Sequence, residues 1–129
     1  MYDTSLIRDA LDNINDCLHE VSEWTSHIST VDDFVTSMNG MILLNAVCMK
    51  LFAIGEEIKN IDKRTNNTFL RSYPIIDWRK VMGMRDIIAH HYFEIDADVV
   101  VQTLLTDIPA LQEVVQQMKS DLSKITTKK

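Results

Sequence analysis

The residues best suited to chemistry lie close together in this sequence, between Arg85 and Tyr92. His90 follows Arg85 after four intervening residues and Tyr92 stands two positions later, which gives the pattern Arg-x4-His-x-Tyr. Histidine titrates near neutral pH and can take up or return a proton, whereas arginine stays charged and offers several donors to phosphate oxygens. RNA supplies its own nucleophile, the 2′-hydroxyl, so this pair suits RNA cleavage without an obligatory metal ion. The bare pattern, taken alone, is more typical of a surface arginine, an ordinary histidine at a helix end and a tyrosine at the edge of the core.

Helical geometry limits how these three side chains can meet. At roughly 100° per residue, Arg85 and His90 are about 140° apart around a regular helix, whereas Arg85 and Tyr92 lie within about 20° of each other. Three arrangements remain open: the helix is distorted near its end, Arg85 reaches around it, or a second subunit completes the site. A two-fold homodimer would achieve the last, because it brings two copies of the segment to one axis.

The other histidines and the two cysteines predict no further site. His91 points about 100° away from its neighbour, and adjacent histidines lack the i,i+4 spacing that places two metal ligands on one helix face. His19 and His27 are solitary. Cys17 and Cys48 are too few and too far apart for a disulfide framework, so we expect reduced core residues. The sequence predicts neither a metal nor a cofactor.

Charge is distributed unevenly along the chain, whose 129 residues carry a net charge of −6. This balance argues against a protein that coats nucleic acid, because such affinity comes from many contacts of Lys and Arg with phosphates. Residues 51–92 nevertheless hold 7 basic and 5 acidic residues, whereas residues 1–50 hold 2 and 8. A site for an anionic substrate is therefore expected in the middle segment. Its candidates for attracting RNA, which the sequence does not rank, are Lys59, Lys63, Arg64, Arg71, Arg79 and Lys80.

Hydrophobic periodicity predicts an all-α fold and one domain over residues 1–129. A first helix, which Asp3 or Thr4 can cap, is indicated by apolar residues at three- and four-residue steps: Leu6, Ile7, Ala10, Leu11, Ile14, Leu18, Val21, Trp24 and Ile28. A second helix is predicted from Thr30–Asp33 as far as Lys59, bent or closed at Gly40 or Gly55. Its expected buried side consists of Phe34, Val35, Met38, Met41, Ile42, Leu44, Val47, Leu51, Phe52 and Ile58.

The second half of the chain contains several helix boundaries. Asn66-Asn67 predicts a turn, and Pro74 ends a short helix that holds Phe69 and Leu70. Asp77 can cap a helix that starts at Trp78 and carries the Arg85–His90 pair. A further helix is predicted from Asp96 or Asp98, and Pro109 suits the first turn of the last helix. Residues 124–129 are expected to fray.

No apolar run in the sequence approaches the ~20 residues that would span a bilayer. The first residues also lack a basic region that leads into an apolar one. We therefore expect a cytoplasmic protein with no membrane partner.

Four ordered segments resemble a known family. They read Ala-Ile-Gly-Glu-Glu at 53–57, Tyr-Pro-Ile-Ile-Asp-Trp at 73–78, Gly-Met-Arg-Asp-Ile-Ile-Ala-His-His-Tyr-Phe-Glu-Ile-Asp at 83–96, and Asp-Ile-Pro-Ala-Leu at 107–111. Together they resemble the HepT-like branch of the HEPN superfamily, over most of the chain from about Ile54 to Leu111. Four segments in the same order are more specific evidence for a family than one Arg-His pair.

The resemblance implies a four- to five-helix HEPN-type bundle that pairs into a two-fold homodimer. It also implies a metal-independent RNA endonuclease, the toxin of a toxin-antitoxin pair whose partner is a minimal nucleotidyltransferase antitoxin. Arg85 and His90 match the family's catalytic pair, and Tyr92 matches the tyrosine that the antitoxin adenylylates. Asp86 stands where Asn is frequent, and a small residue commonly stands in place of Glu57.

Asp86 and Glu56 are candidates for supporting the Arg85–His90 pair, although Glu56 can also be interpreted as part of a solvated helix end.

Two functions other than a ribonuclease also remain open. One is a non-catalytic HEPN module that partners a nucleotidyltransferase, and the other is an ordinary helical interaction domain. The presence of both Arg85 and His90 favours the ribonuclease, because a pure binding module has no need for both.

Overall fold

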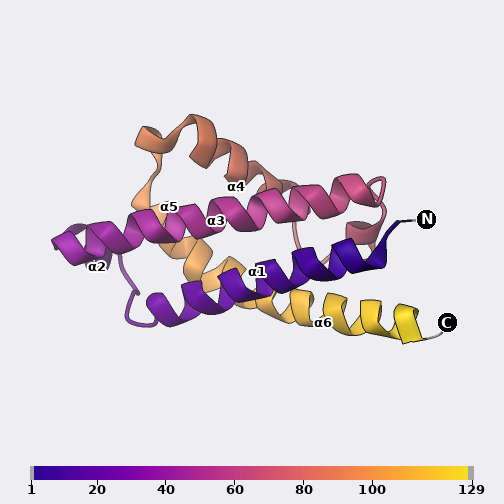
Figure 1. The fold of residues 1–129 in the computed structure, drawn as a ribbon. Helices are drawn as coiled ribbons and strands as arrows, with labels where there is room; N and C mark the ends of the chain where they lie inside the picture. The colour runs from indigo at the N-terminus through magenta and orange to yellow at the C-terminus, as the bar shows by residue number, and fades with distance from the viewer. Residues whose placement is uncertain (1, 128–129) are drawn as a thin grey trace.

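Three long helices lie alongside one another and form the frame of the molecule: α1 (Thr4–Trp24), α3 (Met38–Arg64) and α6 (Ile108–Thr127) (Figure 1). A computed structural model describes residues 2–127 of the chain. α3 packs between α1 and α4 (Trp78–His90), and α6 packs against the other side of α1. α5 (Ala97–Gln102) and the short α2 (Asp32–Val35) complete six α-helices in the described range, which contains no strand. The predicted all-α bundle is confirmed.

Aspartates begin three of the helices, as the sequence predicts. The side chain of Asp3 accepts a hydrogen bond from the Ser5 backbone N–H at the start of α1. The side chain of Asp77 accepts from the Lys80 backbone N–H at the start of α4, and that of Asp96 from the Asp98 backbone N–H at the start of α5. These bonds satisfy backbone donors that the first turn of a helix leaves free. The position of α4, which carries the candidate site, is thus set partly by Asp77.

The predicted second helix is divided into two, so that prediction was wrong in its continuity. A short helix, α2 (Asp32–Val35), is followed by a break at Thr36 and Ser37, and α3 begins at Met38. Ser37 adopts an extended backbone, and its hydroxyl accepts a hydrogen bond from the Gly40 N–H at 3.0 Å. Such a local bond competes with helix continuation. A Cβ at Gly40 would lie 2.5 Å from the Phe34 carbonyl oxygen, so glycine allows α2 to fold back onto α3.

The connection from α3 to α4 follows the predicted turn and short helix. Asn66 and Asn67 adopt positive φ angles of 52° and 62°, a conformation that asparagine tolerates better than most residues. A 3₁₀ turn, η1 (Phe69–Ser72), comes next. The Trp78 indole N–H donates to the Tyr73 carbonyl at 2.9 Å and fixes the first turn of α4 against this connection.

The two helices predicted for the C-terminal part form one continuous helical run. After η2 (Tyr92–Glu94), α5 leads through a π-helical turn, η3 (Thr103–Asp107), directly into α6. Pro109 stands in the first turn of α6, as predicted. The helix continues to Thr127, which includes residues 124–127 of the expected tail. Lys128 and Lys129 lie outside the described residues.

Several apolar residues that the sequence assigned to buried faces are exposed. The core contains most of the predicted α1 stripe together with Phe34, Val47, Leu51 and Ile58, but Leu6 and Trp24 of α1 are exposed. Four residues at the beginning of the predicted second helix are also exposed: Val35, Met38, Met41 and Ile42. The assignment failed there because no other part of the described chain covers that face.

α3 is long and apolar enough to cross a membrane by length and composition. Its most apolar 18 residues have a mean hydropathy of 1.5, and 33% of that window is buried within the fold. A core helix of a soluble protein meets the same criterion, and α3 lies between α1 and α4. The expectation of no membrane partner stays a prediction.

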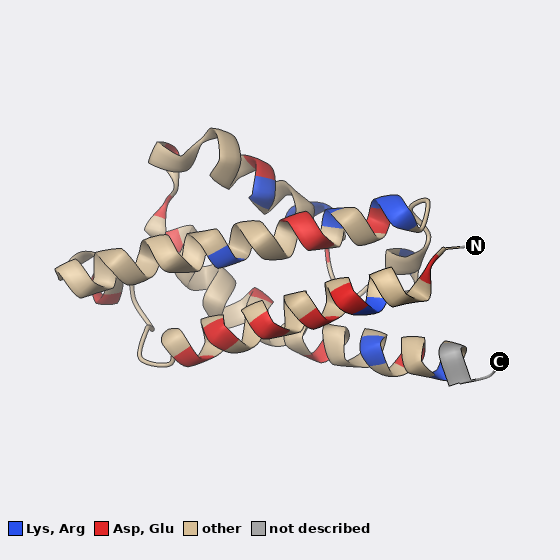
Figure 2. Ribbon diagram, viewed as in Figure 1, with Lys and Arg blue, Asp and Glu red and all other residues tan. Residues whose placement is uncertain are grey.

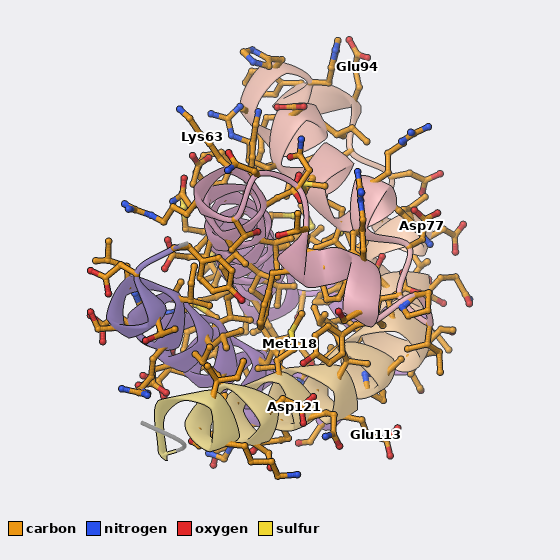
Figure 3. The ribbon with its side chains drawn as sticks, turned by 90° about the vertical axis from the view of Figure 1, so that its right-hand side faces the viewer. Lys63, Asp77, Glu94, Glu113, Met118 and Asp121 are labelled. Atoms are coloured by element: carbon orange, nitrogen blue, oxygen red, sulfur yellow. The ribbon has the colours of Figure 1, made fainter. Side chains whose placement is uncertain are left out.

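Charge separates between the two sides of the bundle. Lys and Arg gather where α3 ends and α4 begins, whereas Asp and Glu recur along α1 (Figure 2). In the side view, Met118 of α6 points into the interior, and Lys63 lies at the outer surface of α3 on the α4 side (Figure 3). Asp121 and Glu113 lie on α6 at the opposite side of the molecule (Figure 3).

Candidate active site

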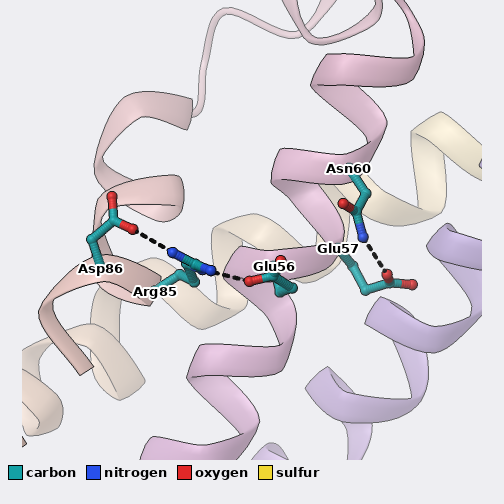
Figure 4. A network of polar contacts seen from close by, with 5 residues as sticks. All are labelled: Glu56, Glu57, Asn60, Arg85 and Asp86. Carbon is teal, nitrogen blue, oxygen red and sulfur yellow. Dashed lines mark hydrogen bonds and ion pairs between the residues drawn. The ribbon is translucent and has the colours of Figure 1, made fainter. Parts of the chain in front are cut away.

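A close crossing of α3 and α4 brings together the side chains that surround Arg85. Gly55 is buried at this crossing, and a Cβ there would lie 3.0 Å from the Arg85 Cβ and 3.0 Å from the Val81 carbonyl oxygen. The absence of a side chain lets the two helices approach. The next residue on α3, Glu56, then faces Arg85 directly (Figure 4).

Arg85 is held by two carboxylates and an aromatic ring. Its Nε donates to Glu56 at 2.5 Å and its Nη1 donates to Asp86 at 2.8 Å, while the guanidinium lies 5.8 Å from the centre of the Phe52 ring (Figure 4). Hydrogen bonding to Glu56, and then to Asp86, raises the pKa of Arg85 above its usual value. A guanidinium has five N–H donors, so these two bonds leave three for another anion. Arg85 is thus fixed in place while three of its N–H donors remain free to bind an anion.

Asp86 is influenced by Arg85, which donates a hydrogen bond to it, and by the charges of Lys59 and His90. The hydrogen bond from Arg85 is the largest cause of the lowered pKa of Asp86, and the charges of Lys59 and His90 lower it further. The structure therefore brings Glu56 and Asp86 to Arg85. Their supporting role in a reaction stays a prediction.

Glu57, the neighbour of Glu56, belongs to a different contact. Its carboxylate accepts hydrogen bonds from Asn13 at 3.1 Å and from Asn60 at 3.2 Å. Asn13 lies on α1, so Glu57 joins α3 to α1 and points away from Arg85 (Figure 4). Of the adjacent glutamates, only Glu56 contacts the candidate site.

His90 is the last residue of α4 and its side chain is exposed. Within residues 2–127 it makes no hydrogen bond or ion pair, and no contact joins it to Arg85. α4 remains helical through His90, and Arg85 is turned toward α3. Of the three arrangements that the sequence left open, helix distortion and an Arg85 that reaches around do not apply. A site that is completed by a second subunit remains.

Tyr92 lies just beyond α4, as the first residue of η2, so the angular relation to Arg85 on one regular helix does not apply. The residue is 41% exposed, and its ring meets Phe93 edge-on, with ring centres 6.0 Å apart. It borders a hollow of about 330 Å³ between α3 and α4. The other residues that line this hollow are Asn45, Met49, Phe52, Ile88 and Ala89. The Tyr92 ring is therefore accessible at the edge of an apolar depression beside the Arg85 network.

An exposed apolar face adjoins this hollow, and sequence reasoning missed it. Met49 is 64% exposed, Ile42 60% and Phe93 fully exposed. Met38 and Met41, at the beginning of α3, extend the same face. One signal was present in the sequence, since a helix with apolar residues around most of its circumference needs more than one covering partner.

The remaining histidines and cysteines are placed much as the sequence predicts. His91 lies 3.6 Å from Glu94 and His19 lies 3.3 Å from Glu23, all at the surface. Cys48 is buried and Cys17 partly buried, and desolvation raises the pKa of both thiols, which favours the unreactive form. Residues 2–127 contain no group of three or more His, Cys, Asp and Glu side chains that could hold a metal ion.

Comparison with known proteins identifies the family. Residues 14–118 match the family model described as "Ribonuclease HepT-like". The chain belongs to the HepT-like ribonuclease family. A protein of Thermococcus cleftensis named "Probable ribonuclease HepT" is 35% identical over 105 residues, which are 81% of this HepT-like chain and 88% of the relative. No solved structure matches the chain.

Two relatives from Methanocaldococcus jannaschii agree with this assignment. "Putative RNase MJ1380" is 30% identical over 112 residues, which cover 87% of this HepT-like chain and 92% of the relative. "Gamma-glutamylcyclotransferase and putative RNase MJ0434" is 32% identical over 114 residues, which cover 88% of this chain. The chain spans 48% of the length of that relative.

Proposed function

We propose that this HepT-like ribonuclease is a metal-independent RNA endonuclease and the toxin of a cytoplasmic toxin-antitoxin pair. One observation carries the proposal: Arg85 is fixed by Glu56 and Asp86 with N–H donors to spare, and His90, five residues later on the same helix, is exposed and without a partner among the described residues. A fixed cation and an available imidazole are the two groups that 2′-hydroxyl attack on RNA requires.

In the proposed reaction, His90 removes the proton of the 2′-hydroxyl. The bond between O2′ and phosphorus forms, and the bond between phosphorus and O5′ breaks. The departing 5′-oxygen takes a proton from a protonated histidine or from water. The free donors of Arg85 bind the non-bridging oxygens as negative charge grows on them. The products are a 2′,3′-cyclic phosphate and a 5′-hydroxyl.

The direct test is cleavage of RNA by the purified protein with excess EDTA present. Wild type is expected to cut and to leave 2′,3′-cyclic phosphate ends, whereas His90→Ala is expected to be inactive with an unchanged circular dichroism spectrum. Unchanged cleavage by His90→Ala would refute the assignment. A wild-type protein that binds a nucleotidyltransferase but never cuts RNA would instead support the non-catalytic binding module.

We propose further that two copies pair through the exposed apolar face formed by Met38, Met41, Ile42, Met49 and Phe93. This face lies beside the hollow that Tyr92 borders, so a two-fold axis there would bring two copies of the end of α4 together. Arg85 of one subunit and His90 of the other would then share a site. Exposed apolar patches of this kind commonly mark interfaces.

Mixing two inactive variants tests this shared site. If each site takes Arg85 and His90 from different subunits, a dimer of Arg85→Ala with His90→Ala has one complete site. Random pairing of equal amounts makes half of the dimers mixed, so about a quarter of wild-type activity should return. No recovery after confirmed subunit exchange would contradict a site made in this way. Met49→Glu is expected to give a monomer in light scattering and to lose cleavage.

The antitoxin is proposed to be a minimal nucleotidyltransferase that adenylylates Tyr92. The phenolic oxygen would attack the α-phosphorus of ATP, pyrophosphate would leave, and the phenolic proton would pass to solvent. An added phosphate brings negative charge and bulk beside Arg85, where the phosphate of RNA should bind. Incubation with the cognate antitoxin and ATP should add the mass of one adenylate to wild type and none to Tyr92→Phe. Absence of any adduct on wild type would contradict the proposal.

A further inference from the structure

The structure separates the basic residues of the middle segment into different surfaces. Phe52 and Glu56, which contact Arg85, stand on one side of α3. Lys59 and Lys63 continue that side, because steps of three and four residues keep Glu56, Lys59 and Lys63 within about 60° around the helix. They lie about 4.5 Å and 10.5 Å farther along the axis than Glu56 at 1.5 Å per residue. A row of basic side chains thus leads away from Arg85.

A third basic residue belongs to the neighbouring side of α4. Arg79 precedes Asp86 by seven residues and His90 by eleven, which puts the three within about 40° around the helix. Since α4 runs antiparallel along α3, Arg79 stands at the end of α4 that lies nearest the end of α3 (Figure 1). Figure 2 shows the resulting concentration of positive charge at this end of the helix pair.

Lys59, Lys63 and Arg79 have different electrostatic surroundings from Lys50, Lys80 and Lys119. Lys59 is close enough to Asp86 to lower the pKa of that carboxyl. Lys59, Lys63 and Arg79 are exposed, and none of them forms an ion pair with a carboxylate in the described part of the chain. Their charges are therefore available to an external anion.

Three other lysines are engaged in ion pairs elsewhere on the molecule. Lys80 pairs with Asp107 at 3.0 Å and borders hollows on the α5 side of α4. Lys50 pairs with Glu20 of α1 at 2.9 Å, and Lys119 pairs with Asp12 at 3.0 Å. The acidic residues along α1 would also repel a polyanion (Figure 2).

We propose that Lys59, Lys63 and Arg79 form a phosphate-binding track for the RNA strand that enters the Arg85 site. The inference rests on the proposed ribonuclease function and deepens it, because it assigns the side from which the strand reaches the scissile phosphate. Binding through the track is electrostatic and independent of base sequence.

The salt dependence of RNA binding tests the track separately from cleavage. Affinity for a labelled single-stranded RNA is measured by fluorescence anisotropy between 50 and 200 mM salt, with His90→Ala in every protein so that the RNA stays intact. The track variant is Lys59→Gln/Lys63→Gln/Arg79→Gln. The control, Lys50→Gln/Lys119→Gln/Lys124→Gln, removes the same net charge from residues outside the track. Circular dichroism and urea unfolding confirm that both proteins fold.

The track variant is expected to lose about 2 from the slope of log affinity against log salt, since each phosphate contact to a single strand contributes about 0.7. If affinity extrapolated to 1 M salt is unchanged, binding at 0.1 M weakens roughly 100-fold. The control should retain the wild-type slope. Replacing the same three positions by the other basic residue, Lys59→Arg/Lys63→Arg/Arg79→Lys, should restore it.

Two results would overturn the inference in distinguishable ways. If active wild type cuts RNA and the track and control variants bind with the same salt slope, the track is refuted while the ribonuclease function stands. If wild type neither cuts nor binds RNA, the proposed function falls and the track with it.

Discussion

Replacing Gly55 by Ala is predicted to destabilise the protein by about 1 kcal/mol, although the same change usually stabilises a helix. Ala is about 0.8–1.0 kcal/mol more favourable than Gly in a helix interior. At Gly55, however, the added methyl group would lie 3.0 Å from the Val81 carbonyl oxygen and from the Arg85 Cβ, so α3 and α4 must move apart. Overpacking of this kind costs about 1–3 kcal/mol, which outweighs the gain in helix propensity.

Gly83 supplies the matched control, because it lies within α4 and a Cβ there would meet no atom within 4 Å. Gly83→Ala should therefore stabilise the protein by up to about 1 kcal/mol. Urea unfolding should separate the two variants by about 2 kcal/mol, or about 1 M in midpoint for a slope near 2 kcal/mol/M. If Gly55→Ala proves as stable as Gly83→Ala, the close crossing of α3 and α4 is refuted.

The same substitution should also affect cleavage, because it moves Arg85 relative to Glu56. A misplacement of about 1 Å can cost about 100-fold in rate, so a shift of a few tenths of an ångström is expected to lower kcat by up to about tenfold. A Gly55→Ala protein that is destabilised as predicted but fully active would show that the Glu56 contact is not needed for the reaction.

Three further predictions concern separate contacts. Ser37→Ala removes the cap of α3 and should cost about 1 kcal/mol in urea unfolding; a stability equal to wild type would contradict the cap. Glu56→Gln keeps the size of the side chain but weakens its bond to Arg85, so kcat should fall more than KM rises, and a change in KM alone would contradict a positioning role. In Tyr73→Phe, Asp121 loses the 2.7 Å hydrogen bond that lowers its pKa. A carboxyl pKa that is lowered in the folded state stabilises the fold at any pH above the pKa of the unfolded chain. The stability difference between the variant and wild type at neutral pH should therefore shrink as the pH falls below about 4. A difference that does not change with pH would refute this assignment.

Local signals in the sequence predicted most of the helix boundaries. Asp3, Asp77 and Asp96 are caps whose side chains act on backbone donors two or three residues away, so neighbouring residues suffice to recognise them. Asn66-Asn67 and Pro109 act through their own backbone preferences in the same way. The break at Ser37 was missed because the apolar pattern runs through it, and only the packing of Gly40 against α2 makes the interruption favourable.

The candidate site was predictable in its members but not in its arrangement. Residue types, spacing and the family resemblance pointed to Arg85, His90 and Tyr92, whereas helical angles left three arrangements open, of which a site completed by a second subunit was one. Which glutamate meets Arg85 depends on how α3 and α4 cross at Gly55, a contact between residues 30 positions apart in sequence. The exposed face around Met49 was likewise invisible, since apolar periodicity shows that a face needs covering but not whether the same chain covers it.

α4 is buried more deeply at its beginning than toward its end, and this difference has a consequence for its dynamics. Its two buried residues, Trp78 and Val81, both lie near its beginning, and no residue from Met82 to His90 is buried. Segments with few buried contacts open locally at a small free-energy cost and exchange their amide hydrogens quickly. A ligand or second subunit that binds only the ordered form adds about 2.7 kcal/mol to that cost at a hundredfold excess over its Kd. Amide exchange in α4 would therefore report directly how much of the protein is assembled.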